Sequence, residues 1–164
     1  MNVLCLIPAR GGSKGLPNKN IKSFLNKPLI EWTIEIALLC EFIDKVIVST
    51  DSDEIANISS KAGAEIPFKR PDDLASDSSP AINVVMHALE KLNTYDHVIV
   101  LQPTSPLRSL NDLNRAFNLY FNNESNSLVS ICKDSKHPSW SYLLGESNKL
   151  IPFDPSKNYI CRQD

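Results

Sequence analysis

The residues best suited to chemistry lie in one loop, at positions 8–20, which reads PARGGSKGLPNKN. This loop contains three of the chain's five glycines, and glycine lets a backbone approach a ligand so closely that several N–H groups point at one anion. Arg10 and Lys14 add positive charge, and Ser13 adds a hydroxyl donor. The combination predicts a loop that binds a polyphosphate.

The spacing of this loop differs from two common phosphate motifs. It has neither the G-x-x-x-x-G-K-[ST] order nor the dinucleotide-binding G-x-G-x-x-G order. A flexible surface turn with solvated basic residues is the alternative interpretation. The charge distribution favours an anion site, because the first 30 residues hold five bases and no acid.

The rest of the chain has the opposite charge balance. It carries 12 basic and 19 acidic residues, so its net charge is −7, although the whole chain is at −2. A basic segment on an acidic body indicates a local anion site and not a nucleic-acid-binding surface.

Three further polar segments also attract attention. Residues 49–53 (STDSD) are suited to metal binding or ribose contact, but helix capping explains the same residue types equally well. In the segment 69–79, Arg70 precedes a proline, and its planar guanidinium suits a pyrimidine carbonyl or a phosphate, with an ordinary surface loop as the alternative. Gln102 ends a strand predicted to be buried, where an amide needs partners or points into a site.

Alternating strands and helices position these loops. Short apolar runs typical of strands buried in a parallel sheet occupy 3–7, 45–49, 97–101 and 128–132. Patterns typical of helices follow the strands, at 28–38, 51–63, 80–92 and 109–121. The order predicts an α/β fold with a mostly parallel sheet, whose ligands bind beyond the carboxyl ends of the strands.

The pattern changes after residue 132. Strand-like pieces at 141–144 and 150–153 alternate with polar turns, which predicts a hairpin arm. We therefore expect a core over 1–132 and the start of an arm and sugar-site segment over 133–164. The dispersed Cys5, Cys40, Cys132 and Cys161 are typical of reduced thiols in a cytoplasmic protein. No apolar run is long enough to span a membrane.

Four motifs in this order resemble one enzyme family. IPARGGSKGLPNKN, VIVSTDSDEIA, RPDDLASD and VLQPTSPLR are similar to those of the cytidylyltransferases that activate nonulosonic acids, including CMP-N-acylneuraminate synthetase. The resemblance implies a three-layer, Rossmann-like nucleotide-binding fold with a hairpin dimerisation arm. It also implies transfer of CMP from CTP to the anomeric hydroxyl of a nine-carbon 2-keto acid sugar, with release of pyrophosphate, in a homodimer that uses Mg²⁺.

The resemblance assigns roles to single residues. Arg10, Ser13 and Lys14 correspond to triphosphate-binding residues, Arg10 and Lys14 being catalytic, and Lys19 supports them. Asn20 and Arg70 resemble the contacts to cytosine and ribose. The sugar would be bound by Gln102 and Arg162.

Two departures from the family pattern shape the expectation. The family's magnesium-binding pair of aspartates lies in a D-x-D motif beyond the region that corresponds to this chain, so we assign no metal ligand, expect the ligands beyond Asp164 and expect a chain shortened at its carboxyl end. The HPSW sequence at 137–140 resembles members that handle bacterial sugars such as legionaminic acid. Activation of a shorter 2-keto acid such as Kdo is a second enzymatic reading, although that branch has acidic residues where LQPTSP stands. A CTP-binding but non-catalytic fragment or nucleotide-binding module is the third.

Overall fold

A computed structural model describes residues 1–13, 15–76, 79–92, 94–123, 126–131, 142–144 and 150–152. The chain divides into two compact units, Met1–Asn126 and Ser127–Asp164, and each is described here by itself. Among the described residues, no helix is both long and apolar enough to cross a lipid bilayer.

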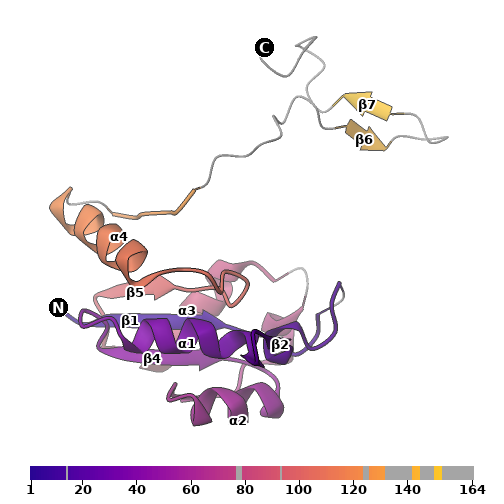
Figure 1. Cartoon of the computed structure of the whole chain (residues 1–164), viewed down its shortest axis with the longest axis horizontal. Helices are drawn as coiled ribbons and strands as arrows, with labels where there is room; N and C mark the ends of the chain where they lie inside the picture. The colour runs from indigo at the N-terminus through magenta and orange to yellow at the C-terminus, as the bar shows by residue number, and fades with distance from the viewer. Residues whose placement is uncertain are drawn as a thin grey trace. The chain divides into compact units, whose positions relative to one another are not determined.

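A parallel sheet forms the centre of the first unit (Figure 1). Its strand order is β4 (Lys45–Ser49), β1 (Val3–Pro8), β5 (His97–Val100), with both neighbours parallel to β1. The five apolar residues of β1 are all buried, as expected for a central strand covered on both faces. The prediction that 97–101 is a fully buried strand is wrong, because β5 pairs only with β1 among the described strands and is half-buried.

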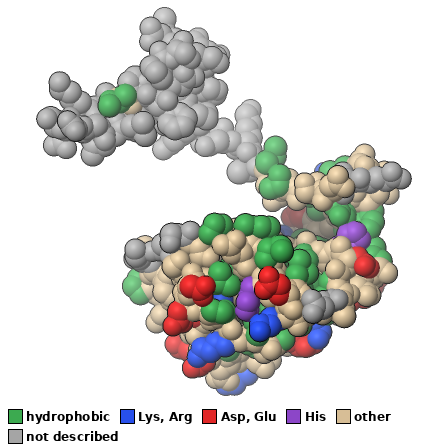
Figure 2. All heavy atoms as spheres, turned by 180° about the vertical axis from the view of Figure 1, so that it is seen from behind, with side chains coloured by type: hydrophobic (Ala, Val, Ile, Leu, Met, Phe, Trp, Pro, Cys, Tyr) green, Lys and Arg blue, Asp and Glu red, His purple; other side chains and the backbone are tan. Residues whose placement is uncertain are grey.

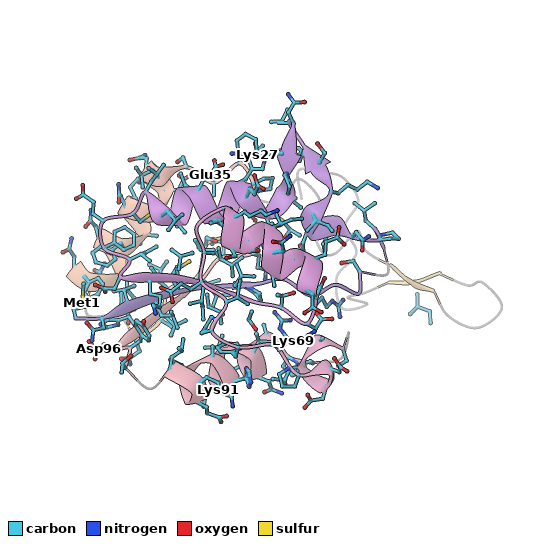
Figure 3. The ribbon with its side chains drawn as sticks, turned by 90° about the horizontal axis from the view of Figure 1, so that it is seen from below. Met1, Lys27, Glu35, Lys69, Lys91 and Asp96 are labelled. Carbon is cyan, nitrogen blue, oxygen red and sulfur yellow. The ribbon has the colours of Figure 1, made fainter. Side chains whose placement is uncertain are left out.

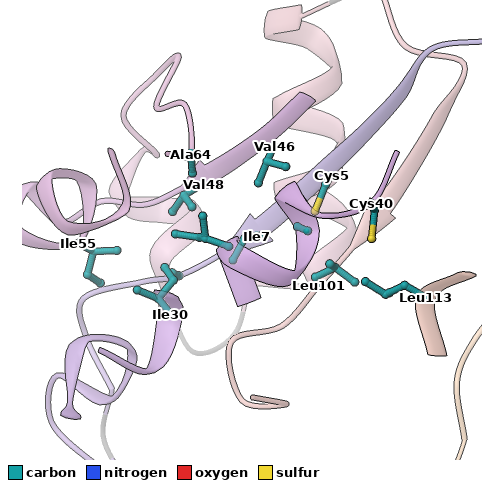
Figure 4. Packing of buried hydrophobic residues seen from close by; sticks show 13 residues of the cluster. Cys5, Ile7, Ile30, Cys40, Val46, Val48, Ile55, Ala64, Leu101 and Leu113 are labelled. Atoms are coloured by element: carbon teal, nitrogen blue, oxygen red, sulfur yellow. The ribbon is translucent and has the colours of Figure 1, made fainter. Parts of the chain in front are cut away.

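Helices cover both faces of this sheet, which gives the expected three layers. The helices are α1 (Leu29–Leu38), α2 (Asp53–Lys61), α3 (Ala81–Leu92) and α4 (Leu110–Asn122). Successive side chains of a strand point to opposite faces. Cys5 and Ile7 therefore pack in one cluster with residues of α1, α2 and α4 (Figure 4), whereas Leu4 and Leu6 pack against α3.

The helices begin and end where the sequence predicts. The Ser52 hydroxyl accepts the Ile55 N–H and caps α2, which ends near Gly63, a glycine with φ +98°. A reciprocal capping box between Ser109 and Asp112 starts α4. Pro28 immediately precedes α1.

A small hairpin before α1 was not predicted. Strands β2 (Ser23–Phe24) and β3 (Lys27–Pro28) pair antiparallel, and the two residues between them, Leu25 and Asn26, have positive φ. Trp32 donates its Nε1–H to the Phe24 carbonyl at 2.9 Å. Lys27 lies over the Trp32 ring and pairs with Glu35, its neighbour in Figure 3. These contacts fasten the hairpin to α1.

Two 3-10 turns complete the first unit, η1 (Lys19–Ile21) and η2 (Asp72–Ala75). On the face of the body seen in Figure 2, acidic and basic side chains are interspersed, so that this face carries no patch of a single sign.

The second unit contains the predicted hairpin. Strands β6 (Tyr142–Leu144) and β7 (Leu150–Pro152) pair antiparallel, with Leu143 opposite Ile151. The prediction of a fourth strand at 128–132 is wrong for residues 128–131, which form no strand, and Cys132 lies outside the described residues. The apolar residues of segment 128–131 have no strand beside them in the described part of the chain, and Val129 is 81% exposed. An apolar run becomes a strand only where a partner supplies hydrogen bonds.

Candidate active site

The candidate site lies where the parallel strands end. Because β1 runs parallel to β4 and to β5, the loops after Pro8, Ser49 and Val100 leave the same edge of the sheet. This is the edge at which α/β proteins bind ligands. The polar loops singled out in the sequence are these three, together with the segment after Lys69.

The loop after β1 is fixed by hydrogen bonds to its backbone. The Asn20 side chain, in η1, donates from Nδ2 to the Arg10 carbonyl at 3.0 Å. The Gly11 N–H donates to Asp51 Oδ1 at 2.9 Å. The Arg10 side chain is half-buried and donates from Nη1 to the Ala75 carbonyl at 3.4 Å. The loop thereby contacts both the loop after β4 and the segment that follows Arg70.

The glycines of this loop differ in what they require. A Cβ on Gly11 would lie 3.1 Å from Ser52 Cβ, a close approach that favours glycine. A Cβ on Gly12 or Gly15 would meet nothing within 4 Å. Of these three positions, Gly11 is the one at which a close approach favours glycine.

Arg70 is the most buried charged residue of the site, with 4% of its surface exposed. Its Nε donates to Ser49 Oγ at 3.0 Å, and its Nη2 donates to the Ser49 carbonyl. Its own N–H donates to the Thr50 carbonyl at 2.8 Å. Burial lowers the pKa of Arg70; the Asp51 carboxylate opposes this shift and the Arg10 charge adds to it. Two arginines and one carboxylate thus interact electrostatically at the end of β4.

The remaining predicted residues have more varied positions. Ser13 and Lys19 are half-buried, and Asn20 is buried at 5% exposure. Lys14 and Arg162 lie outside the described residues.

Gln102 differs from its expected environment. The residue is exposed, and its contacts are within its own loop: Thr104 Oγ1 donates to its Oε1, and Arg108 Nη2 donates to its carbonyl, both at 3.4 Å. The expectation that its amide ends a buried strand is wrong, because β5 lies at the edge of the sheet that the described strands form, and it stops at Val100. Burial lowers the pKa of Arg108, which follows Gln102 in the same loop.

Asp51 also has a contact that the sequence left open. Its neighbour Ser52 caps α2, whereas the Asp51 carboxylate accepts the Gly11 N–H. This bond joins residues 40 positions apart. This hydrogen bond could be predicted from the sequence only if the register between β1 and β4 were already known. Among the described residues, no group of three His, Cys, Asp or Glu side chains is placed to hold a metal ion.

Comparisons with known proteins identify the family of this chain. Residues 4–143 match the cytidylyltransferase family. A pseudaminic acid cytidylyltransferase of Campylobacter jejuni is 39% identical over 99% of this chain and 71% of its own length. A CMP-N,N'-diacetyllegionaminic acid synthase of Legionella pneumophila is 38% identical over 92% of this chain and 66% of its own length. An N-acylneuraminate cytidylyltransferase of Escherichia coli is 40% identical over 93% of this chain, which spans 36% of that protein.

A solved structure supports the fold. It is that of a CMP:2-keto-3-deoxy-manno-octonic acid synthetase complexed with CTP, which superposes with a TM-score of 0.66 at 23% identity. The match covers 76% of this chain, and this chain spans about half (49%) of that structure. The family profile and the relatives together confirm the resemblance found in the four motifs. The chain belongs to the cytidylyltransferase family of nucleotidyltransferases.

Proposed function

We propose that this chain carries the CTP site of an enzyme that transfers CMP from CTP to the anomeric hydroxyl of a nonulosonic acid. The observation that carries the proposal is that Arg10 follows β1 while the buried Arg70 donates to Ser49 at the end of β4, so that both arginines belong to the ligand-binding edge of the sheet in a chain of this family. Two cations beside exposed and half-buried loop backbone suit a polyanionic nucleotide.

The proposed roles are those that the resemblance to the family implies. Arg10, Ser13 and Lys14 bind the triphosphate, and Lys19 supports them. Asn20 and Arg70 contact cytosine and ribose. Gln102 and Arg162 contact the acceptor sugar; the exposure of Gln102 leaves its amide accessible to a ligand. The hairpin of β6 and β7 is the proposed dimerisation arm.

The reaction is a substitution at the α-phosphorus of CTP. The sugar's anomeric hydroxyl oxygen forms a bond to that phosphorus and gives up its proton to solvent, while the bond to the oxygen bridging to the β-phosphorus breaks. Pyrophosphate leaves with that bonding electron pair. Arg10 and Lys14, the proposed catalytic residues, neutralise the charge that develops on it, so catalysis comes from positioning and electrostatic stabilisation.

Mg²⁺ belongs to the proposal as the ion that accompanies the triphosphate. Because no described group of carboxylates, histidines or cysteines is placed to hold it, we derive no step through the metal.

A pyrophosphate-release assay with CTP and Mg²⁺ tests the proposal. The acceptors are N-acetylneuraminate, a legionaminate and a pseudaminate, with Kdo as the acceptor of the competing reading. Turnover with a nine-carbon acid and CTP, but not with UTP, is the expected result. Turnover with Kdo alone would favour the shorter acid. Binding of CTP without turnover would favour a non-catalytic nucleotide-binding module, and neither binding nor turnover would overturn the proposal.

A further inference from the structure

The ladder between β1 and β4 continues past the strands themselves. Ile7 lies opposite Val48 and Pro8 opposite Ser49. The Ala9 N–H then donates to the Ser49 carbonyl at 3.0 Å. Parallel strands repeat this bond every two residues. The next donor is therefore the Gly11 N–H, and its regular acceptor would be the carbonyl of residue 51.

The side chain of residue 51 takes the place of that carbonyl. Asp51 Oδ1 accepts the Gly11 N–H at 2.9 Å. The backbone after Ser52 enters α2 and so leaves the ladder. The Asp51 carboxylate keeps the Gly11 donor paired at this point. Gly11 also approaches this segment so closely that a Cβ would lie 3.1 Å from Ser52 Cβ.

The neighbours of Asp51 have separate tasks, so helix capping does not explain this residue. Ser52 Oγ accepts the Ile55 N–H, which caps α2. Thr50 Oγ1 accepts the Ser52 N–H at 3.1 Å. The Asp51 carboxylate is directed to the loop after β1 and interacts electrostatically with Arg70.

We infer that Asp51 is a positioning residue for the nucleotide loop, in that its carboxylate fixes the Gly11 backbone and with it the direction of the adjacent Arg10. This inference rests on the proposed function, in which Arg10 binds the triphosphate. An acidic residue beside a polyanion site would ordinarily weaken binding by repulsion. At Asp51 the carboxylate instead accepts a backbone N–H, which orders the loop before the nucleotide arrives.

Two substitutions at this position separate its hydrogen bond from its charge. Asp51→Ala removes the acceptor, whereas Asp51→Asn keeps an acceptor oxygen of nearly the same shape without the charge. Asp53→Ala is the matched control, because Asp53 lies two residues further on and its exposed carboxylate pairs with Lys69 at 2.7 Å. All three variants lose the same formal charge.

The first readout is the KM for CTP. We expect Asp51→Ala to raise it about 10- to 100-fold, the loss expected for a hydrogen bond to a charged group. Asp51→Asn should restore it to within about threefold of the parent, with Asp53→Ala unchanged, and kcat at saturating CTP should fall less than the KM rises. A KM for Asp51→Ala within twofold of an active parent, or equal losses in Asp51→Ala and Asp51→Asn, would overturn the inference.

The second readout does not need activity. Amide hydrogen exchange at Gly11 should be slow in the parent and in Asp51→Asn, and fast in Asp51→Ala. Equal exchange in the parent and Asp51→Ala would overturn the inference even in an active enzyme. The three proteins could show this pattern of exchange although the parent never turns over CTP. That result would support the contact between Asp51 and Gly11 and count against the proposed function alone.

Discussion

The contact between Asn20 and the Arg10 carbonyl offers the sharpest test of how the nucleotide loop is held. Asn20 is 5% exposed, and its Nδ2 lies 3.0 Å from the Arg10 oxygen. Asn20→Ala removes one neutral hydrogen bond to a half-buried residue. We expect this to lower the free energy of unfolding by about 0.5–1.5 kcal/mol.

Asn20→Asp has a pH-dependent cost that alanine lacks. The ionised carboxylate presents only acceptors to the Arg10 carbonyl, and it is buried, so its destabilisation exceeds that of alanine. The protonated carboxyl can donate to the same carbonyl. The folded state therefore raises the pKa of the introduced acid. The Asn20→Asp variant is therefore about as stable as the parent below the carboxyl's unfolded-state pKa of about 3.9, and this stability is lost as the pH rises through the raised folded-state pKa.

Urea unfolding followed by circular dichroism at mildly acidic and mildly alkaline pH measures both effects. The matched control is Asn57→Asp, an exposed position in α2, whose free energy should stay within about 0.5 kcal/mol of the parent. CTP affinity should fall about tenfold in Asn20→Ala, because the Arg10 backbone loses its anchor. An Asn20→Asp protein as stable as the parent at alkaline pH, or one without pH dependence beyond that of the control, would refute the reasoning.

Three further outcomes are expected. Arg10→Ala should remove about 2–4 kcal/mol of transition-state stabilisation and so slow pyrophosphate release more than tenfold. A rate within threefold of the parent would contradict the role of Arg10. Cys5 and Cys40 are buried free thiols, and burial raises the pKa of Cys5 to about 12. Iodoacetamide at neutral pH should therefore label both only after denaturation, as peptide mass spectrometry would detect; rapid native labelling of Cys5 would contradict its burial. Ser109→Ala should destabilise the protein by about 1 kcal/mol in a thermal melt. Hydrogen bonds from Ser109 lower the pKa of Asp112, so the Asp112 contribution should be present above its ordinary value and be lost as the pH falls through the lowered one.

The sequence identified the elements whose signals are local. The run at 3–7 is apolar at every position because β1 is covered on both faces, and Ser109 with Asp112 forms the predicted capping box. The hairpin of β2 and β3 was missed because two-residue strands are too short for alternation to be seen. Leu25, which has positive φ at its turn, is also not a residue that predicts such a turn. The run at 128–131 misled because apolarity does not supply a strand partner.

The same distinction applies to the site. Arg10 and Arg70 could be chosen as candidates because charge and residue type are visible in the sequence alone. The partners that hold them could not, because each depends on register. The Asp51 carboxylate reaches the Gly11 N–H only because β1 and β4 pair in this register. The Arg70 side chain reaches Ser49 because the Arg70 N–H donates to the carbonyl of the neighbouring Thr50. Sequence reasoning left Asp51 between capping and ligand binding for this physical reason.

The manner in which these arginines are held has a consequence for the energetics of the site. The side-chain hydrogen bonds of Arg70 go to the hydroxyl and carbonyl of Ser49, both neutral, and its burial lowers its pKa. A buried cation held by neutral acceptors costs stability, and the Asp51 carboxylate nearby offsets part of that cost. An anion that binds beside Arg70 would offset more of it. Nucleotide binding should therefore stabilise the fold as well as fill the site, by RT ln(1 + [L]/Kd) at each ligand concentration. The buried charge of Arg70 costs stability, and it is also a charge whose cost an anionic nucleotide bound nearby would partly offset.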